Sequence, residues 1–588
     1  MSNPLSLSSL HPVLRSAVNL LTRLNTLSAW YDEWLNSRAE LQRLAPPDSH
    51  GFLNFVLSKL DADVLVSNPP QLDCIPANGP LLVVANHPLG AMEGMLLSRL
   101  LLRFRPDLKV LTNELLLSFP EFNDLFIGVD VLNSNAQAKN MKGMRAANRH
   151  LAGGGALLIF PAGTVSQMKL PSGDIEDSAW SPMVGRLALK HGANCLPFHI
   201  DGRNTFLFYL AGLIHKRLRT ALLPRAMLDK RGSVLRITAG AMIDKEALQS
   251  LGSASCITQY LRVSCDLLKG AESPTFSEPP SAVVENAGDP GKIENQFASM
   301  QIFLAARSGD FAVYCAPYSA LGCIADLLAR DREVSFREVG EGTGKELDKD
   351  RFDPHYWHIV AWDHAEQRLI GGYRVVRTDQ VLCDRGVDGL YSHSQFRYGK
   401  QFLNLLGPSI EVGRSFITAA YQRNPKALDL LWKGIGSFVR QNSDCHTLFG
   451  CVSISARYSP LARTLLADTF LHNHVADMQV RQLVRPVSPK RSISRTWDKE
   501  LLLAFGNIAV FNKLLGSQGI DRRVPTLIRH YLAMNGKFVD FSVNNDFNKS
   551  LDGLIVVDLR QAPHKYLQRY LGKESTEDFL EHWTGKAS

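Results

Sequence analysis

An imidazole and a carboxylate lie six positions apart at His87 and Glu93, directly after the apolar run 80–85. A buried strand of this kind passes into a loop and then a helix, which places both side chains near the end of the strand. The pair suits a base that removes a proton from an alcohol, because the carboxylate orients one ring nitrogen and stabilises the imidazolium formed when the other accepts the proton. On spacing alone, a solvated or structural His–Glu pair is the alternative interpretation.

The stretches around this motif alternate between strand-like and helix-like patterns. Strands are expected at 81–85, 156–160, 195–200 and 234–237, and helices at 93–104, 140–152 and 183–191. This alternation predicts an α/β domain with a largely parallel sheet. A further helix is expected at 12–24, where it either packs on the core or lies at an interface.

The segment 271–294 is rich in Pro, Ser, Glu and Gly and has no apolar period, so it is interpreted as a linker. It divides the chain into domains at 1–270 and 295–588. In the second domain, strands are expected at 357–362, 369–376, 409–412 and 447–453, and helices at 316–330, 426–440, 460–466 and 527–534. This mixture predicts an α+β fold.

Composition excludes several classes of function. The 588 residues are 45% hydrophobic and 21% charged, and no apolar run approaches the roughly 20 residues of a membrane-spanning helix. The nine cysteines form no CxxC pair and no metal-ligand spacing, so neither a metal site nor a disulfide framework is expected, and no cofactor is implied. The net charge of +8 at pH 7 implies an anionic partner, but the sequence has no nucleic-acid-binding signature.

Three blocks of the first domain belong together. They are the stretch from Asn86 to Glu93 with Gly90 at its turn, the strand end Phe160, Pro161, Ala162 and Gly163, and the stretch 195–199. Over about residues 70–245 they resemble the glycerolipid acyltransferase family. The resemblance implies that His87 is the general base on a lipid hydroxyl and that Glu93 orients it. It further implies that substrate is bound by Asn86, Gly90, Phe160, Pro161 and Gly163, with the Gly163 loop as the expected oxyanion donor.

Two departures from that family favour one branch of it. Five residues instead of four separate the His from its acid, which is Glu93 instead of Asp, and Ala162 stands where the FPEG-type block has its Glu. Both features resemble the branch that includes haemolysin-like proteins and lyso-ornithine-lipid O-acyltransferases. The resemblance therefore favours an aminolipid acceptor over lysophosphatidate.

A basic segment at 203–236 has eight basic residues and one acid, interleaved with the apolar stretches 206–214 and 218–223. A solvated basic face over a core helix is one interpretation. The alternative is an interfacial segment on an anionic membrane surface, where each cation contributes on the order of 1 kcal/mol. The resemblance implies a peripheral enzyme on the inner face of the bacterial inner membrane, which requires such a surface.

The second domain carries four charged blocks, at 334–339, 348–353, 369–374 and 410–416. On composition alone they are structural ion pairs around half-buried strands. Over about residues 300–565, however, their order resembles acyl-homoserine-lactone synthases and ornithine N-acyltransferases, which share a GNAT-like core. The resemblance places six residues on the charged substrate-site positions of these families: Arg337, Asp350, Asp353, Arg374, Glu411 and Arg414.

Amide formation is the chemistry that this second resemblance implies. An α-ammonium must lose a proton before it attacks a thioester; Glu411 is the expected proton acceptor, and Arg374 or Arg414 would hold the amino-acid carboxylate. The glycine loop that cradles the pyrophosphate of coenzyme A is missing after Glu411, where 421–429 contains no glycine. Acyl carrier protein, an acidic donor, is therefore the expected partner.

Together these features predict an α/β domain of glycerolipid-acyltransferase type followed by a GNAT-like α+β domain. The expected function is ornithine lipid synthesis. The second domain would N-acylate ornithine with a 3-hydroxyacyl group, and the first would O-acylate the resulting lyso-ornithine lipid at its 3-hydroxyl. The alternative is a single lysophospholipid O-acyltransferase with a binding or regulatory second half. Lysine or glutamine in place of ornithine stays open as the head group.

Overall fold

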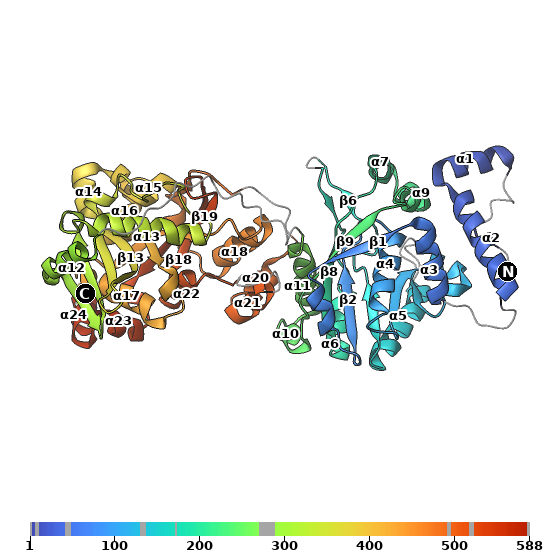
Figure 1. Cartoon of the computed structure of the whole chain (residues 1–588), viewed down its shortest axis with the longest axis horizontal. Helices are drawn as coiled ribbons and strands as arrows, with labels where there is room; N and C mark the ends of the chain where they lie inside the picture. Colours follow the sequence, from blue (N-terminus) through green and yellow to red (C-terminus); the bar gives the residue numbers. More distant parts are fainter. Residues whose placement is uncertain are drawn as a thin grey trace. The chain divides into compact units, whose positions relative to one another are not determined.

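The computed structural model describes residues 3–5, 11–41, 49–129, 137–170, 173–269, 289–490, 496–516 and 523–584. The chain forms two compact units (Figure 1). Unit 1 comprises Met1–Glu272 and Arg495–Arg522, and unit 2 comprises Ser273–Ser494 and Arg523–Ser588. Each is a mixed α/β unit around one main sheet, which agrees with the predicted fold class.

Unit 1 is built on a seven-stranded sheet in the order β1-β9-β8-β2-β5-β3-β4. Its strands are β1 (Asp63–Ser67), β2 (Leu81–Ala85), β3 (Lys109–Asn113), β4 (Phe126–Val129), β5 (Ala156–Ile159), β8 (Asn194–Ile200) and β9 (Val234–Ala239). All neighbours are parallel except β8 and β9. β2 lies between two parallel neighbours, and all five of its residues are buried, which explains its uninterrupted apolar sequence.

Helices pack on this sheet and continue from its strands. They are α1 (Pro12–Thr22), α2 (Leu24–Leu41), α3 (Ser49–Leu60), α4 (Ala91–Leu101), α5 (Gln137–Ala152), α6 (Met183–His191), α7 (Phe206–Ile214), α8 (Lys216–Ala221), α9 (Leu223–Leu228), α10 (Lys245–Gln249) and α11 (Ala254–Leu267). Alternate residues of β2, namely Leu81, Val83 and Ala85, join residues of α3 and α4 in one buried cluster. A short hairpin, β6 (Gln167–Met168) and β7 (Ile175–Glu176), follows β5.

Two helices from the far end of the chain complete unit 1. They are α20 (Lys499–Ala504), which lies next to α11, and α21 (Ile508–Gly516), which follows it (Figure 1). The Gln259 side chain donates to Asp498 (2.7 Å) and accepts the Asp498 N–H (2.8 Å), and the ring of Phe505 packs 6.2 Å from that of Tyr260. The sequence predicts that these residues belong to the domain at 295–588, whereas in the structure they form part of the first compact unit.

Unit 2 is built on an eight-stranded sheet in the order β10-β11-β12-β13-β15-β16-β19-β18. Its strands are β10 (Leu304–Ser308), β11 (Phe311–Pro317), β12 (Trp357–Asp363), β13 (Arg368–Arg377), β15 (Ser409–Ile417), β16 (Thr447–Ile454), β18 (Lys537–Asn544) and β19 (Ser550–Asp558). Only β15 and β16 are parallel neighbours. Helix α17 (Pro425–Gln441) connects them, as a parallel crossover requires.

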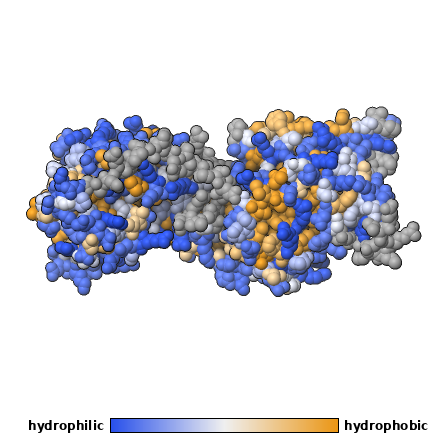
Figure 2. Space-filling view, viewed as in Figure 1, coloured by the Kyte–Doolittle hydropathy of each residue, from blue (hydrophilic) through white to orange (hydrophobic). Residues whose placement is uncertain are grey.

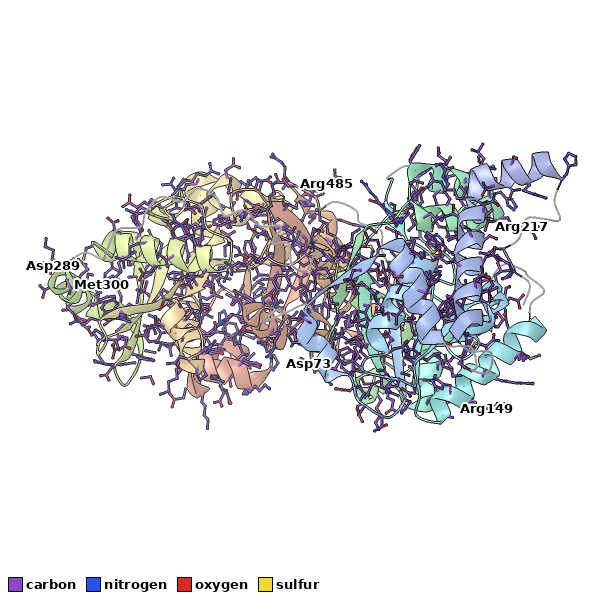
Figure 3. The ribbon with its side chains drawn as sticks, turned by 45° about the vertical axis from the view of Figure 1, so that its right-hand side comes forward. Asp73, Arg149, Arg217, Asp289, Met300 and Arg485 are labelled. Atoms are coloured by element: carbon purple, nitrogen blue, oxygen red, sulfur yellow. The ribbon has the colours of Figure 1, made fainter. Side chains whose placement is uncertain are left out.

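The remaining helices of unit 2 surround its sheet. They are α12 (Pro290–Ser299), α13 (Ile324–Glu338), α14 (Thr378–Arg385), α15 (Tyr391–Gln395), α16 (Lys400–Leu406), α18 (Pro460–Asn473), α19 (Met478–Gln482), α22 (Thr526–Ala533), α23 (His564–Leu571) and α24 (Lys573–Thr584). A two-stranded ribbon, β14 (Phe396–Arg397) and β17 (Arg485–Pro486), completes it. Figure 3 labels Asp289 and Met300, the residues that flank α12.

Two expected boundaries differ from the structure. The helix predicted at 316–330 begins later, at Ile324, because Phe311–Pro317 forms β11; its apolar residues fit a buried strand as well as a helix. The predicted linker lies outside the described residues up to 288, and α12 begins at Pro290 within its last part.

Candidate functional site

His87 and Glu93 lie at the carboxyl end of β2, on the two sides of the loop that leads into α4. His87 Nδ1 is 3.0 Å from Glu93 Oε1; the carboxylate is fully buried, whereas the imidazole keeps 18% of its surface exposed. The two atoms are within ion-pair distance but are not aligned as a hydrogen bond. Glu93 Oε1 also accepts the N–H groups of Leu89 (2.8 Å) and Gly90 (2.7 Å). One carboxylate oxygen thus holds both the loop and the ring.

Two asparagines fix the loop that carries His87. The Asn86 amide exchanges two hydrogen bonds with the backbone of Ile200 (2.7 and 3.0 Å) and so ties the end of β2 to the end of β8. Asn204 Nδ2 donates to Pro88 O at 3.1 Å. Gly90 has φ +114°, a backbone conformation that favours glycine, and a Cβ there would also displace the end of the Leu223 side chain, 2.6 Å away.

Phe160 lies against the imidazole, and Pro161 and Gly163 form the turn that follows it. The Phe160 ring stacks on His87 with ring centroids 4.6 Å apart. Gly163 has φ +66°, and its N–H donates to Phe160 O at 2.9 Å. Pro161 O accepts the N–H of Ser181 at 3.0 Å. The Gly163 N–H, expected as an oxyanion donor, is therefore already used inside its own turn.

Asp177 joins this site without any signal in the sequence motifs. Its Oδ1 accepts the backbone N–H of His87 (3.2 Å) and the hydroxyl of Ser166 (2.6 Å), and its Oδ2 accepts Trp180 Nε1 (3.0 Å). Asp177 follows the hairpin strand β7, so only the return of that hairpin brings it to His87. Asp177 thus holds the backbone of the loop that carries His87.

An apolar surface lies beside this loop. Phe206 and Ile214, at the two ends of α7, expose 66% and 77% of their area. Further exposed apolar side chains on the same helix and the next are Leu207, Leu210, Leu213 and Leu218. Figure 2 shows them as a hydrophobic band over α7. Because α7 starts two residues after Asn204, the band is joined directly to the loop of His87.

Basic groups flank the apolar surface, and α1 lies close to it. Arg217, labelled in Figure 3, is exposed directly after α7. Arg23 forms an ion pair with Asp229 at 2.9 Å and thereby ties the end of α1 to α9, and Leu20 on α1 is 75% exposed. In the part of the chain that the structure describes, no helix is long and apolar enough to cross a membrane.

Three arginines and three aspartates form a buried cluster in unit 2. Arg332 pairs with Asp348 (2.8 Å) and Asp353 (3.0 Å). Arg374 pairs with Asp350 (2.7 Å) and Asp353 (2.9 Å). Arg414 pairs with Asp348 (3.2 Å) and Asp350 (3.0 Å). Each carboxylate contacts two cations, and the cluster is neutral as a whole, which is the arrangement that makes buried charges tolerable.

The charges of this cluster change the titration of its members. Burial alone would raise the pKa of Asp350, but the charges of Arg374 and Arg414 outweigh it and hold that pKa well below its usual range. Burial would likewise lower the pKa of Arg374, and Asp350 and Asp353 raise it instead. Asp350 and Arg374 therefore stay charged near neutral pH.

Arg337, which the resemblance places at a substrate-site position, is outside this cluster, and Arg332 belongs to it. Arg337 pairs with Glu333 at 2.7 Å and donates to the backbone carbonyl of Lys345. Asp348 was also missed as a member of the cluster. Arg332 lies four residues after the buried Leu328, on the same buried face of α13. Its position on that face of the helix is the feature of the sequence that distinguishes it from Arg337.

Glu411 lies close to the cluster, and its oxygens are occupied. Oε2 accepts the Tyr356 hydroxyl and the N–H of Tyr391 (3.0 Å), and Oε1 accepts the N–H of Ser392 (2.6 Å). The last two donors are the first N–H groups of α15. Glu411 thus anchors that helix from β15 and has no surface in the adjoining pocket.

The two parallel strands of the sheet part next to Arg414. β15 and β16 pair only over 409–411 and 447–449, although both strands continue further. A Cβ at Gly450 would lie 1.9 Å from Val412 O, so only glycine fits where the strands separate. A β-bulge follows on β15, where Arg414 and Ser415 oppose the single residue Tyr373, and Arg414 has φ +53°. Strained backbone of this kind is concentrated at functional sites.

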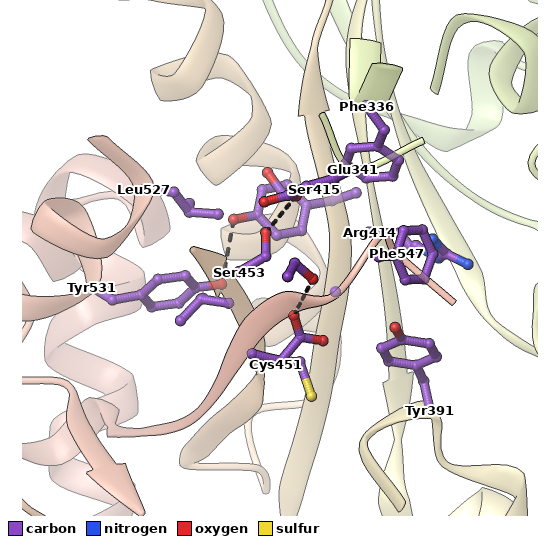
Figure 4. Close-up of a pocket in the computed structure, with 15 residues that line it drawn as sticks. Phe336, Glu341, Tyr391, Arg414, Ser415, Cys451, Ser453, Leu527, Tyr531 and Phe547 are labelled. Atoms are coloured by element: carbon purple, nitrogen blue, oxygen red, sulfur yellow. Dashed lines mark hydrogen bonds between the residues drawn. The ribbon is translucent and has the colours of Figure 1, made fainter. Parts of the chain in front are cut away.

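A pocket opens between the separated strands (Figure 4). Residues 413–415 of β15 and 451–453 of β16 form two of its walls. Aromatic side chains form the others: Phe336, Tyr373, Tyr391, Tyr531 and Phe547. Two carboxylates, Glu341 and Asp552, also line it, and neither belongs to the predicted site. Within the described ranges, no group of three His, Cys, Asp or Glu side chains is arranged to hold a metal ion.

Comparison with known families agrees with this division. Residues 63–273 match the family described as Acyltransferase, and residues 332–433 match the family described as Acetyltransferase (GNAT) domain. The chain therefore carries an N-terminal acyltransferase domain, which holds His87 and Glu93, and a C-terminal GNAT domain, which holds the Arg–Asp cluster and the bulge of β15.

Three characterised relatives are similar to parts of the chain. A glycine N(alpha)-acyltransferase of Phocaeicola vulgatus is 27% identical over 38% of this chain and 72% of its own length. An L-ornithine N(alpha)-acyltransferase of Rhizobium meliloti is 26% identical over 40% of this chain and 75% of its own. A lyso-glycine lipid O-acyltransferase of Phocaeicola vulgatus is 27% identical over 36% of this chain and 75% of its own. These names support aminolipid acyl transfer as a general activity and leave the amino acid undecided.

Proposed function

We propose that this chain makes an acylated amino-acid lipid in two steps, one in each unit. Unit 2 joins a 3-hydroxyacyl group to the α-amine of an amino acid, with ornithine as the preferred acceptor. Unit 1 then acylates the 3-hydroxyl of that lyso-lipid. The observation that carries the proposal is the presence, in one chain, of a His–Glu base beside an apolar surface and a separate polar pocket between parting strands.

The O-acyl step uses His87 as the base. Its Nε2 takes the proton of the lipid hydroxyl as the oxygen attacks a thioester, and Glu93 stabilises the imidazolium. The stack of Phe160 on the ring and the backbone contact of Asp177 keep the imidazole and its loop in place. Asn86 and Gly90 act by holding the loop, and Pro161 and Gly163 by shaping the turn beside it.

The N-acyl step uses the gap between β15 and β16. Where two parallel strands separate, their facing backbone N–H and C=O groups are no longer paired with each other. An extended ligand that carries amide groups can form hydrogen bonds with them, as an added β-strand would. The pantetheine arm of a thioester donor has this chemistry. Asn424 caps α17 with its own side chain, which accepts the N–H of Lys426 at 3.0 Å, and no glycine loop for pyrophosphate is present. Acyl carrier protein is therefore the preferred donor.

The acceptor of the O-acyl step is a lipid, and the band over α7 supplies a surface for it. Exposed apolar side chains beside cationic groups bind an anionic membrane surface. Asn204, at the start of this band, donates a hydrogen bond to the loop of His87. A lyso-lipid could therefore stay in the membrane interface while its hydroxyl reaches His87. This arrangement supports the proposal that the chain attaches to the inner face of a bacterial inner membrane.

Expression in a bacterium that lacks aminolipids, with total lipids analysed by mass spectrometry, tests both steps. The wild-type chain is expected to yield an acyloxyacyl amino-acid lipid, and His87→Ala only its lyso form. His191→Ala, a change on the far end of α6, is the matched control and should behave as wild type.

Two results would count against the proposal. If wild type produces no new amino-acid lipid, the aminolipid function is wrong and a lysophospholipid acceptor with a regulatory second half becomes the leading alternative. If His87→Ala still yields the diacylated lipid, the O-acyl base lies elsewhere.

A further inference from the structure

Two carboxylates that line the pocket of unit 2, those of Glu341 and Asp552, do not belong to the Arg–Asp cluster. Glu341 follows the end of α13 by three residues, and Asp552 on β19 pairs in register with Ser453 of β16. Ser453 Oγ donates to Glu341 Oε2 at 2.7 Å (Figure 4), so this serine is a neighbour of both acids. Both side chains are more than nine-tenths buried, and both line the pocket.

Charge counting shows what the pocket lacks. The three arginines and three aspartates of the cluster cancel, and they include Arg414, the only cationic side chain among the described residues of the pocket lining. Glu341 and Asp552 add two carboxylates to this neutral cluster, and among the described residues neither forms an ion pair, although the charge of Arg414 acts on Asp552. Buried charges of one sign are costly unless a ligand compensates them.

We infer that the amino-acid pocket is built for a diamino acid, with Asp552 holding the side-chain ammonium and Glu341 accepting the proton of the α-ammonium. This inference rests on the N-acyl step proposed above and names the acceptor class for it. A glycine acceptor carries only one ammonium and would leave one of the two acids unpaired.

The hydrogen bonds divide the two roles. Asp552 has both oxygens occupied, by Ser550 Oγ (3.1 Å) and Asn544 Nδ2 (2.8 Å), which favours a permanent carboxylate that pairs with a cation. Glu341 accepts a hydrogen bond on Oε2 only, and among the described residues Oε1 has no partner. An unoccupied oxygen that faces the pocket suits a proton acceptor.

Titration agrees with this division. Burial and, to a smaller extent, the neighbouring charge of Asp552 raise the pKa of Glu341 to about 7, against the opposing hydrogen bond from Ser453. A base of that pKa gains a proton readily near neutral pH. Burial also raises the pKa of Asp552, while Asn544, Ser550 and Arg414 lower it and favour the charged form.

The step balances as follows. Glu341 removes one proton from the α-ammonium, and the free amine attacks the thioester carbon. The C–N bond forms and the C–S bond breaks. The second proton lost by nitrogen goes to the departing sulfur, which leaves as the thiol of the carrier arm. Glu341 returns its proton to water, and no oxidant, metal or cofactor is consumed.

The test compares an acceptor that has a second amine with acceptors that lack it. The purified full chain is given a 3-hydroxyacyl carrier-protein thioester with ornithine, with norvaline (ornithine without its δ-amine) or with glycine, and kcat/KM for amide formation is measured. Ornithine is expected to exceed norvaline and glycine at least tenfold. In Asp552→Asn the ratio of ornithine to norvaline should fall towards one, whereas Glu341→Gln should slow both acceptors at least 100-fold.

Matched controls remove an exposed acid of the same type. Glu338→Gln, on the outer face of α13, and Asp384→Asn, on α14, should leave rates and ratios unchanged. The comparison of ornithine with norvaline uses the wild-type chain alone, so it stands even if a variant does not fold.

The outcomes separate the inference from the function on which it rests. If amide forms and norvaline or glycine serves as well as ornithine, the diamino-acid pocket is wrong and the N-acyl function stands. If Asp552→Asn is folded and keeps the wild-type ratio, Asp552 does not hold the second ammonium. If no acceptor yields amide, both the N-acyl function and the pocket assignment are wrong.

Discussion

At the scale of single residues, the acids of the two sites are distinguished by what occupies their oxygens. Glu93 and Glu411 each accept N–H groups at the start of a helix, and both were selected from the sequence. Glu93 still has an imidazole 3.0 Å away, whereas the oxygens of Glu411 are occupied by a tyrosine and backbone. A residue type at a family position therefore does not by itself identify a proton acceptor.

The rate of N-acylation should depend on pH through Glu341. Only its carboxylate accepts a proton, and its pKa is raised to about 7 by burial. The rate is therefore expected to rise with pH through about 7 and to fall roughly tenfold per unit below it. The measurement is kcat/KM for amide formation with ornithine between pH 5.5 and 8.5.

The neighbours of Glu341 provide the control for that profile. The titratable and charged groups that line the same pocket are Asp552, Arg414, Tyr373, Tyr391, Tyr531 and Cys451. Removing the negative charge in Asp552→Asn should move the midpoint to lower pH, since Asp552 raises the pKa of Glu341. An unchanged midpoint in that variant would mean that another group, such as the substrate amine, sets the profile.

At the scale of elements, the phase of a helix decides which charges meet. Arg332 and Arg337 lie on the same helix, α13, and both stand near acidic residues in the sequence. Arg332 occupies the buried face and joins Asp348 and Asp353, whereas Arg337 pairs with Glu333 one turn away. The block pattern identified two of the three aspartates and two of the three arginines, but Asp348 and the third arginine required the helix to be placed on its sheet.

Helix α7 carries a prediction about membrane attachment. Phe206→Glu together with Ile214→Glu places charges on the two most exposed apolar positions of the band. Because apolar burial and attraction to anionic lipid act together there, binding to vesicles containing phosphatidylglycerol should weaken at least about tenfold. Co-sedimentation of the full chain measures this.

Ile302→Glu is the control for the α7 variant. Ile302 is 84% exposed in unit 2, so the change alters an equally exposed apolar residue outside the band. Vesicle binding should stay as in wild type. Equal loss in both variants would contradict a specific role for α7.

At the scale of the whole molecule, the chain passes between its two units three times. It leaves unit 1 after Glu272, returns for Arg495–Arg522, and then goes back to unit 2. The returning helices bury Leu501, Phe505, Phe511, Leu514 and Leu515. A segment of the second half of the sequence thus stabilises the unit that holds His87.

This arrangement predicts that a change in the second half weakens the first activity. Phe505→Ala removes a buried ring beside Tyr260 and should lower the stability of unit 1 by about 3–5 kcal/mol. Heat inactivation should then affect O-acyl transfer to a supplied lyso-lipid at a lower temperature than N-acyl transfer. Leu503→Ala, a 66% exposed position next to it, should leave both curves unchanged. Equal effects on both activities in Phe505→Ala would contradict the assignment of these helices to unit 1.

The sequence by itself determined the two types of fold, the strands and helices with clear periodicity, and the His87–Glu93 pair. These features are local. The pattern of neighbouring residues determines a buried strand or an amphipathic helix, and one short loop joins His87 to Glu93. Only the tertiary structure decided that Arg332 replaces Arg337, that Glu341 and Asp552 share a pocket, and that 495–522 belongs to unit 1. Such groups meet through strand register, helix phase and chain return, and no local pattern encodes proximity between distant parts of a chain.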